Sequence, residues 1–326
     1  MRRASRLLLA LILLAGASVP AQARPYRPPR TPFGRPDLQG TWSNGSFTRL
    51  ERPQQLHALV VPPADAAAFE RTFASDFAND KSDGVGGRQS ETWELGSSLA
   101  RIGGQIRSSW IVDPPDGRLP YSPAGRKLLD AALKRINSFD NPEDRSYSDR
   151  CLLGSRSVAG PPMLNANYNN HYQIVQTRDA VVIVVEMVHD ARIIPLTRKT
   201  HLPQQMRPWM GDSIGHWEGD TLVVETTNFN PEQGMTAQTG LYMSPSAKVS
   251  ERFTRVAADQ ILYQFTVEDP DVYSQTWRGE EVLTASKEAV YEYACHEGNY
   301  SLFAILDGAR VQERRRAAET KAVPAP

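Results

Sequence analysis

Three stretches rich in β-branched and aromatic residues follow one another between residues 168 and 229, and they most constrain the fold of this chain. They read YNNHYQIVQT, AVVIVVEMVHDARIIPL and HWEGDTLVVETTNF, and turn residues bound each of them. This composition is typical of β-strands, and short connections between successive strands favour antiparallel pairing. The centre of the chain is therefore predicted to be an antiparallel sheet that carries ionisable side chains.

The flanking segments extend this sheet and add helices. Phe69, Phe73 and Phe77 recur every four residues and predict a helix over residues 62–79. Ser122 followed by Pro123 predicts the start of a second helix, and a third is expected after Asn299. Further strands are expected at RSSWIVD, KVSERFTRV, QILYQFTVED, SQTWRGEEVLTAS and AVYEYAC. We predict a mainly β fold, an antiparallel meander of about nine or ten strands closed into a lipocalin/calycin-like β-barrel with a few peripheral helices.

Two resemblances accompany this prediction. Gly40-Thr41-Trp42, at the start of the first expected strand, resembles the G-x-W signature of lipocalins, in which the tryptophan packs on an arginine from a late strand. A tryptophan at the start of any other strand is the alternative. The blocks EMVHDARIIPL, HWEGDTLVVETTNF, ERFTRV, FTVEDP and YACHEGNY together resemble a family of exported bacterial proteins. That second resemblance implies export and supplies no catalytic residue.

The N-terminus predicts export. Arginines, an apolar run and small residues ending at Ala23 are typical of a secretory signal peptide, and the apolar run is too short to span a bilayer. We therefore expect a periplasmic or secreted protein without a membrane anchor. The predicted division is a signal peptide at 1–23, a Pro-rich strap at 24–36, a single β-barrel-like domain at 37–310, and a charged, disordered tail at 311–326.

Charge and cysteine usage limit the partners and the chemistry. Loss of the signal peptide removes three arginines and no acid, so the formal charge falls from 0 to about −3, and neither nucleic acid nor an anionic membrane is an expected partner. Cys151 and Cys295 are the two cysteines, and an oxidising compartment favours a disulfide between them. The alternative is a reactive thiolate with His296 as its base, which adjacent positions on a strand disfavour.

The sequence carries no signature of a bound cofactor. Paired zinc-ligand motifs, a dinucleotide-binding glycine pattern and a phosphate loop are missing from it. Gly211-Asp212-Ser213 is similar to a hydrolase nucleophile motif but lacks the strand–turn–helix context. We expect no cofactor and no metal. The alternative is a metal held by histidines, namely His189, His201, His216 or His296.

Ionisable residues within the expected strands form the candidate site. On one strand Glu186, Asp190 and Arg192 would share a face, and a bulge would bring His189 inward. The alternative for these residues is a buried ion pair or a solvent-facing surface. His296 would be held at a strand end, or else would precede a helix capped by Asn299 or Ser301. We predict catalytic roles for His189, Asp190, Glu186 and His296, and substrate contacts from Tyr172, Arg192, Tyr168, Asn170 and Trp217, in one pocket under a lid at residues 80–104.

These expectations lead to one functional prediction and one alternative. Acids, histidines and tyrosines are the chemical groups available, so an enzyme of this kind would act by cofactor-independent proton transfer, as a lyase, isomerase or hydratase. Its substrate would be a small, mostly apolar molecule bound by the barrel. The alternative is a non-catalytic periplasmic protein that binds a ligand or carbohydrate. Substrate identity and oligomeric state are not predicted.

Overall fold

The computed structural model describes residues 26–79, 96, 98–166, 168–231 and 240–322. The predicted signal peptide and most of the predicted lid lie outside these residues. No helix in the described part is both long enough and apolar enough to cross a membrane.

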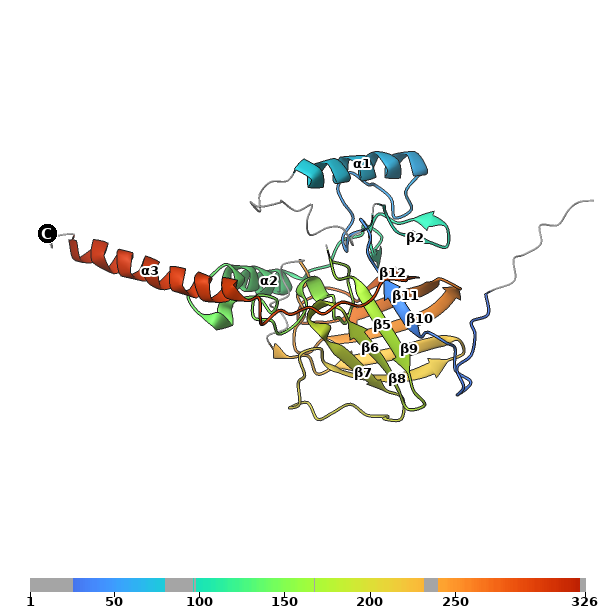
Figure 1. Ribbon diagram of the computed structural model, residues 1–326. Coiled ribbons are helices and arrows are strands. Elements are labelled where there is room, and N and C mark those ends of the chain that lie inside the picture. The colour runs from blue at the N-terminus through green and yellow to red at the C-terminus, as the bar shows by residue number, and fades with distance from the viewer. Residues whose placement is uncertain (1–25, 80–95, 97, 167, 232–239, 323–326) are drawn as a thin grey trace, which may run out of the picture.

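One curved antiparallel sheet dominates the structure (Figure 1). Its strands follow the order β7-β6-β5-β1-β12-β11-β10-β9-β8, and β4 pairs with β12. The two end strands, β7 and β8, lie in contact, so the sheet forms a nearly closed barrel with a seam between them. The predicted fold class is confirmed. The bounds are β1 Gly40–Ser43, β4 Ile111–Asp113, β5 His171–Gln176, β6 Ala180–Val185, β7 Ala191–Pro195, β8 Asp212–Glu218, β9 Thr221–Thr227, β10 Lys248–Ala257, β11 Gln260–Glu268 and β12 Trp277–Ala285, with a separate hairpin of β2 Arg101–Ile102 and β3 Gln105–Ile106.

Alternate residues of the strands point into the barrel and fill it. In β11 these are Ile261, Tyr263, Phe265 and Val267, all of them buried. The Phe265 ring lies against Gly279 of β12, where a Cβ atom would come within 2.1 Å of the ring. Only glycine therefore allows this ring to occupy the core.

A loop closes one end of the barrel. Met163 is completely buried, and its backbone N–H donates to the Tyr263 hydroxyl at 2.9 Å. The Tyr172 hydroxyl donates to the carbonyl of Val158, also buried, at 3.1 Å. Both tyrosines point inward, so the loop around residues 158–164 packs on the barrel interior at this end.

Trp42 of β1 adopts the arrangement that the G-x-W resemblance implies. Its side chain is 1% exposed, and its indole Nε1 donates to the Leu38 carbonyl at 2.9 Å. Arg255 of β10 lies over the ring, with Cζ 5.3 Å from the ring centroid, a cation–π geometry. The predicted contact between this tryptophan and an arginine from a late strand is confirmed.

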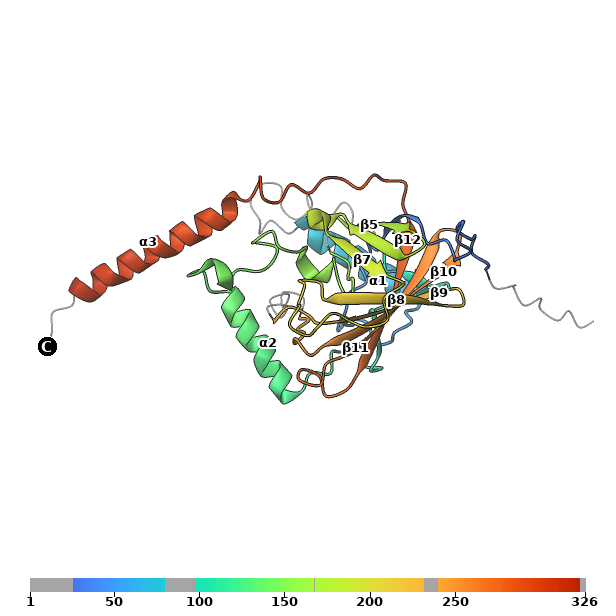
Figure 2. The same ribbon diagram turned by 90° about the horizontal axis from the view of Figure 1, so that it is seen from below.

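Three helices, α1 Pro63–Asn79, α2 Pro123–Ile136 and α3 Tyr300–Ala322, lie outside the barrel. The starts of the first two are confirmed, and the Ser122 hydroxyl accepts the Gly125 N–H at 2.9 Å as an N-cap of α2. Figures 1 and 2 both show α3 projecting away from the sheet. This helix includes residues 311–322, so the described part of the predicted disordered tail is helical. The described residues also include three short 3₁₀ helices, η2 Pro142–Asp144, η3 Ser155–Ser157 and η4 Met187–His189.

Some expected strands are shorter or absent. RSSWIVD contributes only β4, and AVYEYAC forms no strand. The chain also reverses at EMVHD, because η4 separates β6 from β7 and Val188 and His189 have positive φ values of 63° and 44°. The prediction that Glu186, Asp190 and Arg192 share one strand face is therefore wrong.

The predicted disulfide is confirmed. Cys151 and Cys295 are bonded, with an S–S distance of 2.03 Å and a Cα–Cα distance of 5.7 Å. The bond joins the loop that follows α2 to the segment that precedes α3. This segment, residues 286–299, crosses the outside of the barrel between β12 and α3 (Figure 1).

Candidate active site at the barrel seam

A pocket of about 330 Å³ opens at the seam between β7 and β8. Its apolar lining comes from the loop before β8, from the loop after Cys151 and from β7, and consists of Pro208, Trp209, Met210, Leu152, Leu153, Ala191 and Ile193. Its polar lining comes from Asp190, Arg192, Asp212 and Ser213. A concave, largely apolar surface with a few polar groups suits a small, mostly apolar molecule.

Asp190 is the polar group of this pocket that can exchange a proton near neutral pH. It follows the η4 turn, and its Oδ2 atom is buried without a hydrogen-bond partner. Burial raises the pKa of this carboxyl to about 6, although the Gly154 N–H and the nearby His189 act in the opposite direction. A carboxyl with such a pKa can serve as a general acid or a general base.

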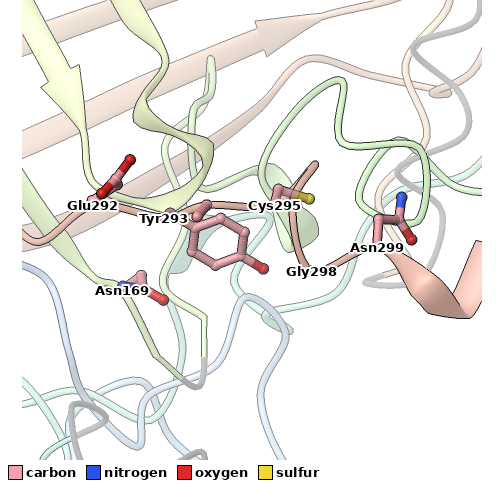
Figure 3. Close-up of a pocket in the computed structure, with 7 residues that line it drawn as sticks. Asn169, Glu292, Tyr293, Cys295, Gly298 and Asn299 are labelled. Atoms are coloured by element: carbon pink, nitrogen blue, oxygen red, sulfur yellow. The ribbon is translucent and has the colours of Figure 1, made fainter.

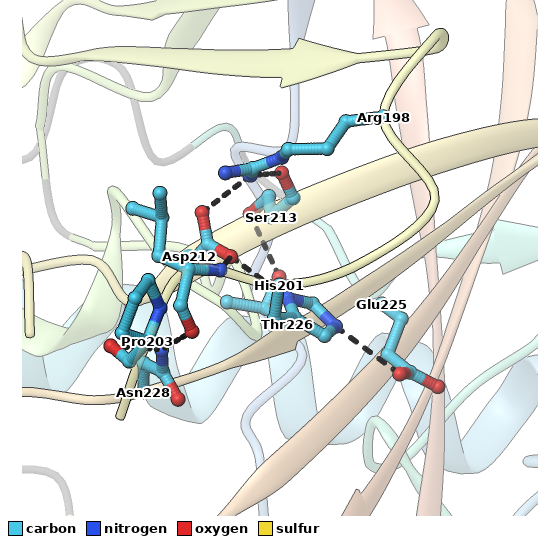
Figure 4. Close-up of polar contacts among 9 residues, drawn as sticks. Arg198, His201, Pro203, Asp212, Ser213, Glu225, Thr226 and Asn228 are labelled. Atoms are coloured by element: carbon cyan, nitrogen blue, oxygen red, sulfur yellow. Dashed lines mark hydrogen bonds and ion pairs between the residues drawn. The ribbon is translucent and has the colours of Figure 1, made fainter. Parts of the chain in front are cut away.

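Asp212, in the same pocket, is held in the ionised state (Figure 4). One carboxylate oxygen accepts from Arg198, and the other accepts from His201 Nδ1 and from the Leu202 N–H, each at 2.9 Å. Burial opposes ionisation, but the hydrogen bonds from Leu202, Arg198 and His201 outweigh it and hold the pKa of Asp212 below its usual range. The two carboxyls of the pocket are thus shifted in opposite directions.

The support behind Asp212 continues across the barrel wall. His201 Nε2 contacts Glu225 Oε1 of β9 at 3.2 Å (Figure 4). Glu225 also pairs with Lys248 of β10. The Asn228 side-chain amide donates to the Leu202 carbonyl at 2.8 Å and fixes the loop that carries His201.

Within the described residues, no group of three or more His, Cys, Asp and Glu side chains could hold a metal ion.

Arg192 projects from β7 toward the barrel interior and is 3% exposed. Its guanidinium makes two hydrogen bonds to the fully buried Glu251 of β10, one of them at 2.9 Å, and the Tyr263 hydroxyl donates to the same carboxylate at 2.8 Å. Burial alone would lower the pKa of Arg192, and Glu251 outweighs burial and raises it. Arg192 therefore forms the buried ion pair that the sequence analysis gave as the alternative to substrate binding.

Glu186 lies elsewhere, with two partners outside the seam pocket. Its Oε2 atom contacts His171 Nδ1 at 3.1 Å, and its Oε1 atom accepts the Tyr291 N–H at 3.0 Å. Burial raises the pKa of Glu186, but the bonds from His171 and Tyr291 outweigh it and keep the pKa below its ordinary value. His171 Nε2 in turn contacts the Ser286 hydroxyl at 3.0 Å.

The remaining predicted residues do not line the seam pocket. The Tyr172 hydroxyl and the Asn170 side chain are buried and committed to internal hydrogen bonds, Asn170 with both backbone groups of Ala166. Tyr168 and Trp217 are partly buried against the core, whereas His189 and His296 are exposed. Of the predicted set, the seam pocket brings together only Asp190 and Arg192.

A second pocket, of about 420 Å³, lies beside the disulfide (Figure 3). Asn169, Tyr293, Glu292 and Asn299 contribute to its lining. The Asn299 side-chain oxygen accepts the Leu302 N–H at 3.2 Å and so caps α3, as the structural alternative for this segment predicts. His296 does not line this pocket.

Comparisons with known proteins identify no family for this chain. No family model matches the sequence, and no curated protein matches it. Among solved structures, the chain is similar to a mutant of the fluorescent protein UnaG, with 13% identity and a TM-score of 0.22, over 36% of this chain and 72% of that one. Membership of an exported bacterial family stays a prediction from the sequence blocks.

The sequence did not predict Asp212 or Arg198 as site residues, and it indicated His201 only as a possible metal ligand. Gly211-Asp212-Ser213 is similar to a hydrolase nucleophile motif, and this similarity points to the serine rather than to the aspartate. Asp212 stands at the first position of β8, where the chain enters the sheet beside the seam. Asp212 is a site candidate because specific partners shift its pKa and it lines a pocket, and both features depend on the fold.

The raised pKa of Asp190 predicts how stability changes with pH. Its folded pKa of about 6 exceeds the ordinary value of 3.8, so folding is favoured when the carboxyl is protonated. Relative to Asp190→Asn, the free energy of unfolding of the wild type should fall by about 1–2 kcal/mol between about pH 4 and pH 7, allowing for partial solvent screening. Urea unfolding at both pH values measures this. Asp179→Asn, in the exposed β5–β6 turn, is the control and should show no such change.

Proposed function

We propose that the protein binds a small, mostly apolar molecule in the seam pocket and catalyses cofactor-independent proton transfer on it, as a lyase, isomerase or hydratase. One observation carries the proposal. The pocket holds two carboxyls in different states, a buried Asp190 with an unpartnered oxygen and an Asp212 fixed as a carboxylate by three donors. Pairs of acids separated in this way divide the roles of proton exchange and charge stabilisation.

In the proposed reaction Asp190 moves the proton. As a carboxylate it removes a proton from a carbon beside an electron-withdrawing group, and the electron pair passes into that group. As a carboxylic acid it returns the proton to another carbon in an isomerase, or to a departing hydroxyl in a lyase or hydratase. Asp212 does not exchange protons, and it orients the polar end of the substrate through a hydrogen bond or favours developing positive charge. Trp209 and Met210 exclude water from the apolar part of the substrate.

The compartment belongs to the same proposal. A disulfide within a folded domain is typical of oxidising surroundings, which supports a periplasmic or secreted protein. A non-catalytic ligand-binding protein is the second candidate function, favoured by the nearly closed barrel beside an apolar pocket. It predicts binding without turnover.

Turnover measured in deuterium oxide distinguishes the two functions. Purified protein is incubated with a panel of small hydroxy, keto and unsaturated acids and their esters, and mass spectrometry follows deuterium uptake and gain or loss of water. For any substrate found, Asp190→Asn should lower the rate by roughly 10²–10⁴-fold. Asp179→Asn is the matched control and should retain the wild-type rate.

Two results would count against this proposal. Saturable binding at the seam with no exchange in the whole panel would favour the binding protein. Turnover that survives Asp190→Asn would remove this residue from the chemistry. Met210→Trp, which fills the pocket, should abolish binding in either case and verifies that the ligand occupies the seam.

A further inference from the structure

A carboxylate, an imidazole and a hydroxyl form a chain on the outer face of the barrel, away from the seam pocket. Glu186 Oε2 is 3.1 Å from His171 Nδ1, and His171 Nε2 is 3.0 Å from the Ser286 hydroxyl. His171 points outward because its neighbour Tyr172 points into the barrel. Its ring reaches past Ser43 of β1 to the end of β12, since β1 lies between β5 and β12.

The hydrogen bonds define where the protons lie. Glu186 has a pKa below its ordinary value, so its carboxylate only accepts hydrogen bonds. His171 Nδ1 must therefore carry a proton to donate to Glu186. In a neutral imidazole the other nitrogen, Nε2, is then the acceptor. The Ser286 oxygen accepts the Glu288 N–H at 3.1 Å. Its own hydrogen is left to donate to His171 Nε2 at 3.0 Å. The hydrogen bonds thus run in one direction, with Ser286 donating to His171 and His171 donating to Glu186.

Burial increases from the serine to the histidine to the carboxylate, in the same order as the hydrogen bonds. Glu186 is fully buried and His171 is 6% exposed, while Ser286 is partly accessible to solvent. The Ser286 N–H donates to the Thr41 carbonyl at 2.9 Å, which fixes the serine backbone against β1. The N–H of the next residue, Lys287, makes no hydrogen bond with the described residues. An N–H in that position can stabilise an oxyanion formed at the serine.

We propose that Ser286 is an activated nucleophile and that His171 and Glu186 make the outer face of the barrel a second catalytic site, for hydrolysis of small esters. The Ser286 oxygen attacks the ester carbonyl carbon as its proton passes to His171 Nε2. The tetrahedral oxyanion then collapses, the C–O bond to the alcohol breaks, and His171 returns the proton to the departing alcohol. Water hydrolyses the acyl-serine by the same steps, and Glu186 stabilises the imidazolium in both halves.

An organophosphorus fluoridate tests the proposal without knowledge of the natural ester. The Ser286 oxygen would displace fluoride from phosphorus, and the label would appear by intact-mass measurement and peptide mapping. We expect one label per native chain, at Ser286, and no label on denatured protein. Ser286→Ala should abolish it, and His171→Gln should slow it by roughly 10²–10⁴-fold. Ser246→Ala, at an exposed serine with no histidine partner, should label at the wild-type rate.

The same variants are compared in hydrolysis of p-nitrophenyl acetate. Ser286→Ala should lose the hydrolytic activity that Ser246→Ala keeps. Circular dichroism and thiol titration verify that each variant is folded and disulfide-bonded. Native protein that takes up no label, or a label that persists in Ser286→Ala, overturns the proposal. Asp179→Asn should change neither readout. The two proposed sites share no residue, so failure here leaves the seam-pocket proposal intact.

Discussion

Arg192→Met is expected to lower the free energy of unfolding by roughly 3–5 kcal/mol, because it leaves a buried carboxylate without its partner. Glu251 is 0% exposed, and within the barrel its charge is balanced by the Arg192 guanidinium and one tyrosine hydroxyl. Methionine has a similar length but neither charge nor donor. Guanidinium unfolding followed by tryptophan fluorescence measures the loss.

Two further variants separate the cost of an orphaned charge from the value of the pair. Arg192→Met combined with Glu251→Met should recover most of the loss, because a buried ion pair and apolar residues of similar volume are often of similar stability. Arg252→Met breaks an exposed pair with Glu218 and should have a much smaller effect than Arg192→Met. If Arg192→Met and Arg252→Met lower the free energy of unfolding equally, water must reach the Glu251 carboxylate inside the barrel.

Removal of the disulfide should have the other large effect. The bond joins positions 144 residues apart, so it restricts the unfolded chain strongly. The loop-closure argument gives about 4–5 kcal/mol for a loop of this size, and measured losses are typically about 2–5 kcal/mol. Paired replacement of Cys151 and Cys295 by serine should lower the unfolding midpoint accordingly, in the same guanidinium assay.

Reductant provides the control for this prediction. Wild-type protein in dithiothreitol should unfold at the midpoint of the double serine variant, and the variant should not respond to dithiothreitol. Thiol titration of denatured, unreduced protein should find no free thiol among Cys151 and Cys295. Two free thiols in that sample would refute the bond itself.

The sequence by itself determined the elements with strong local signals. Alternation of apolar and polar residues in the sequence predicted strands such as β10 and β11. A strand that faces a core on one side requires a period of two, and the structure shows this alternation as buried and exposed residues. Ser122 and Pro123 located the start of α2, because capping depends on adjacent residues. The cysteine pair followed from the predicted oxidising compartment, and the packing of Trp42 followed from the G-x-W resemblance.

Only the tertiary structure decided the rest. The chain turns at Val188 and His189 because the surrounding fold imposes positive φ values that these residue types rarely adopt alone. AVYEYAC has strand composition but no strand to join, since β1 and β11 already occupy both edges of β12. Asp190 and Asp212 line one pocket because the sheet curves until its two end strands touch. Their pKa values separate because Asp190 has one buried oxygen without a hydrogen-bond partner, whereas Asp212 receives three donors. The spacing of strands along the sequence does not show which two strands meet when the sheet closes into a barrel. The candidate site could therefore be identified only from the structure.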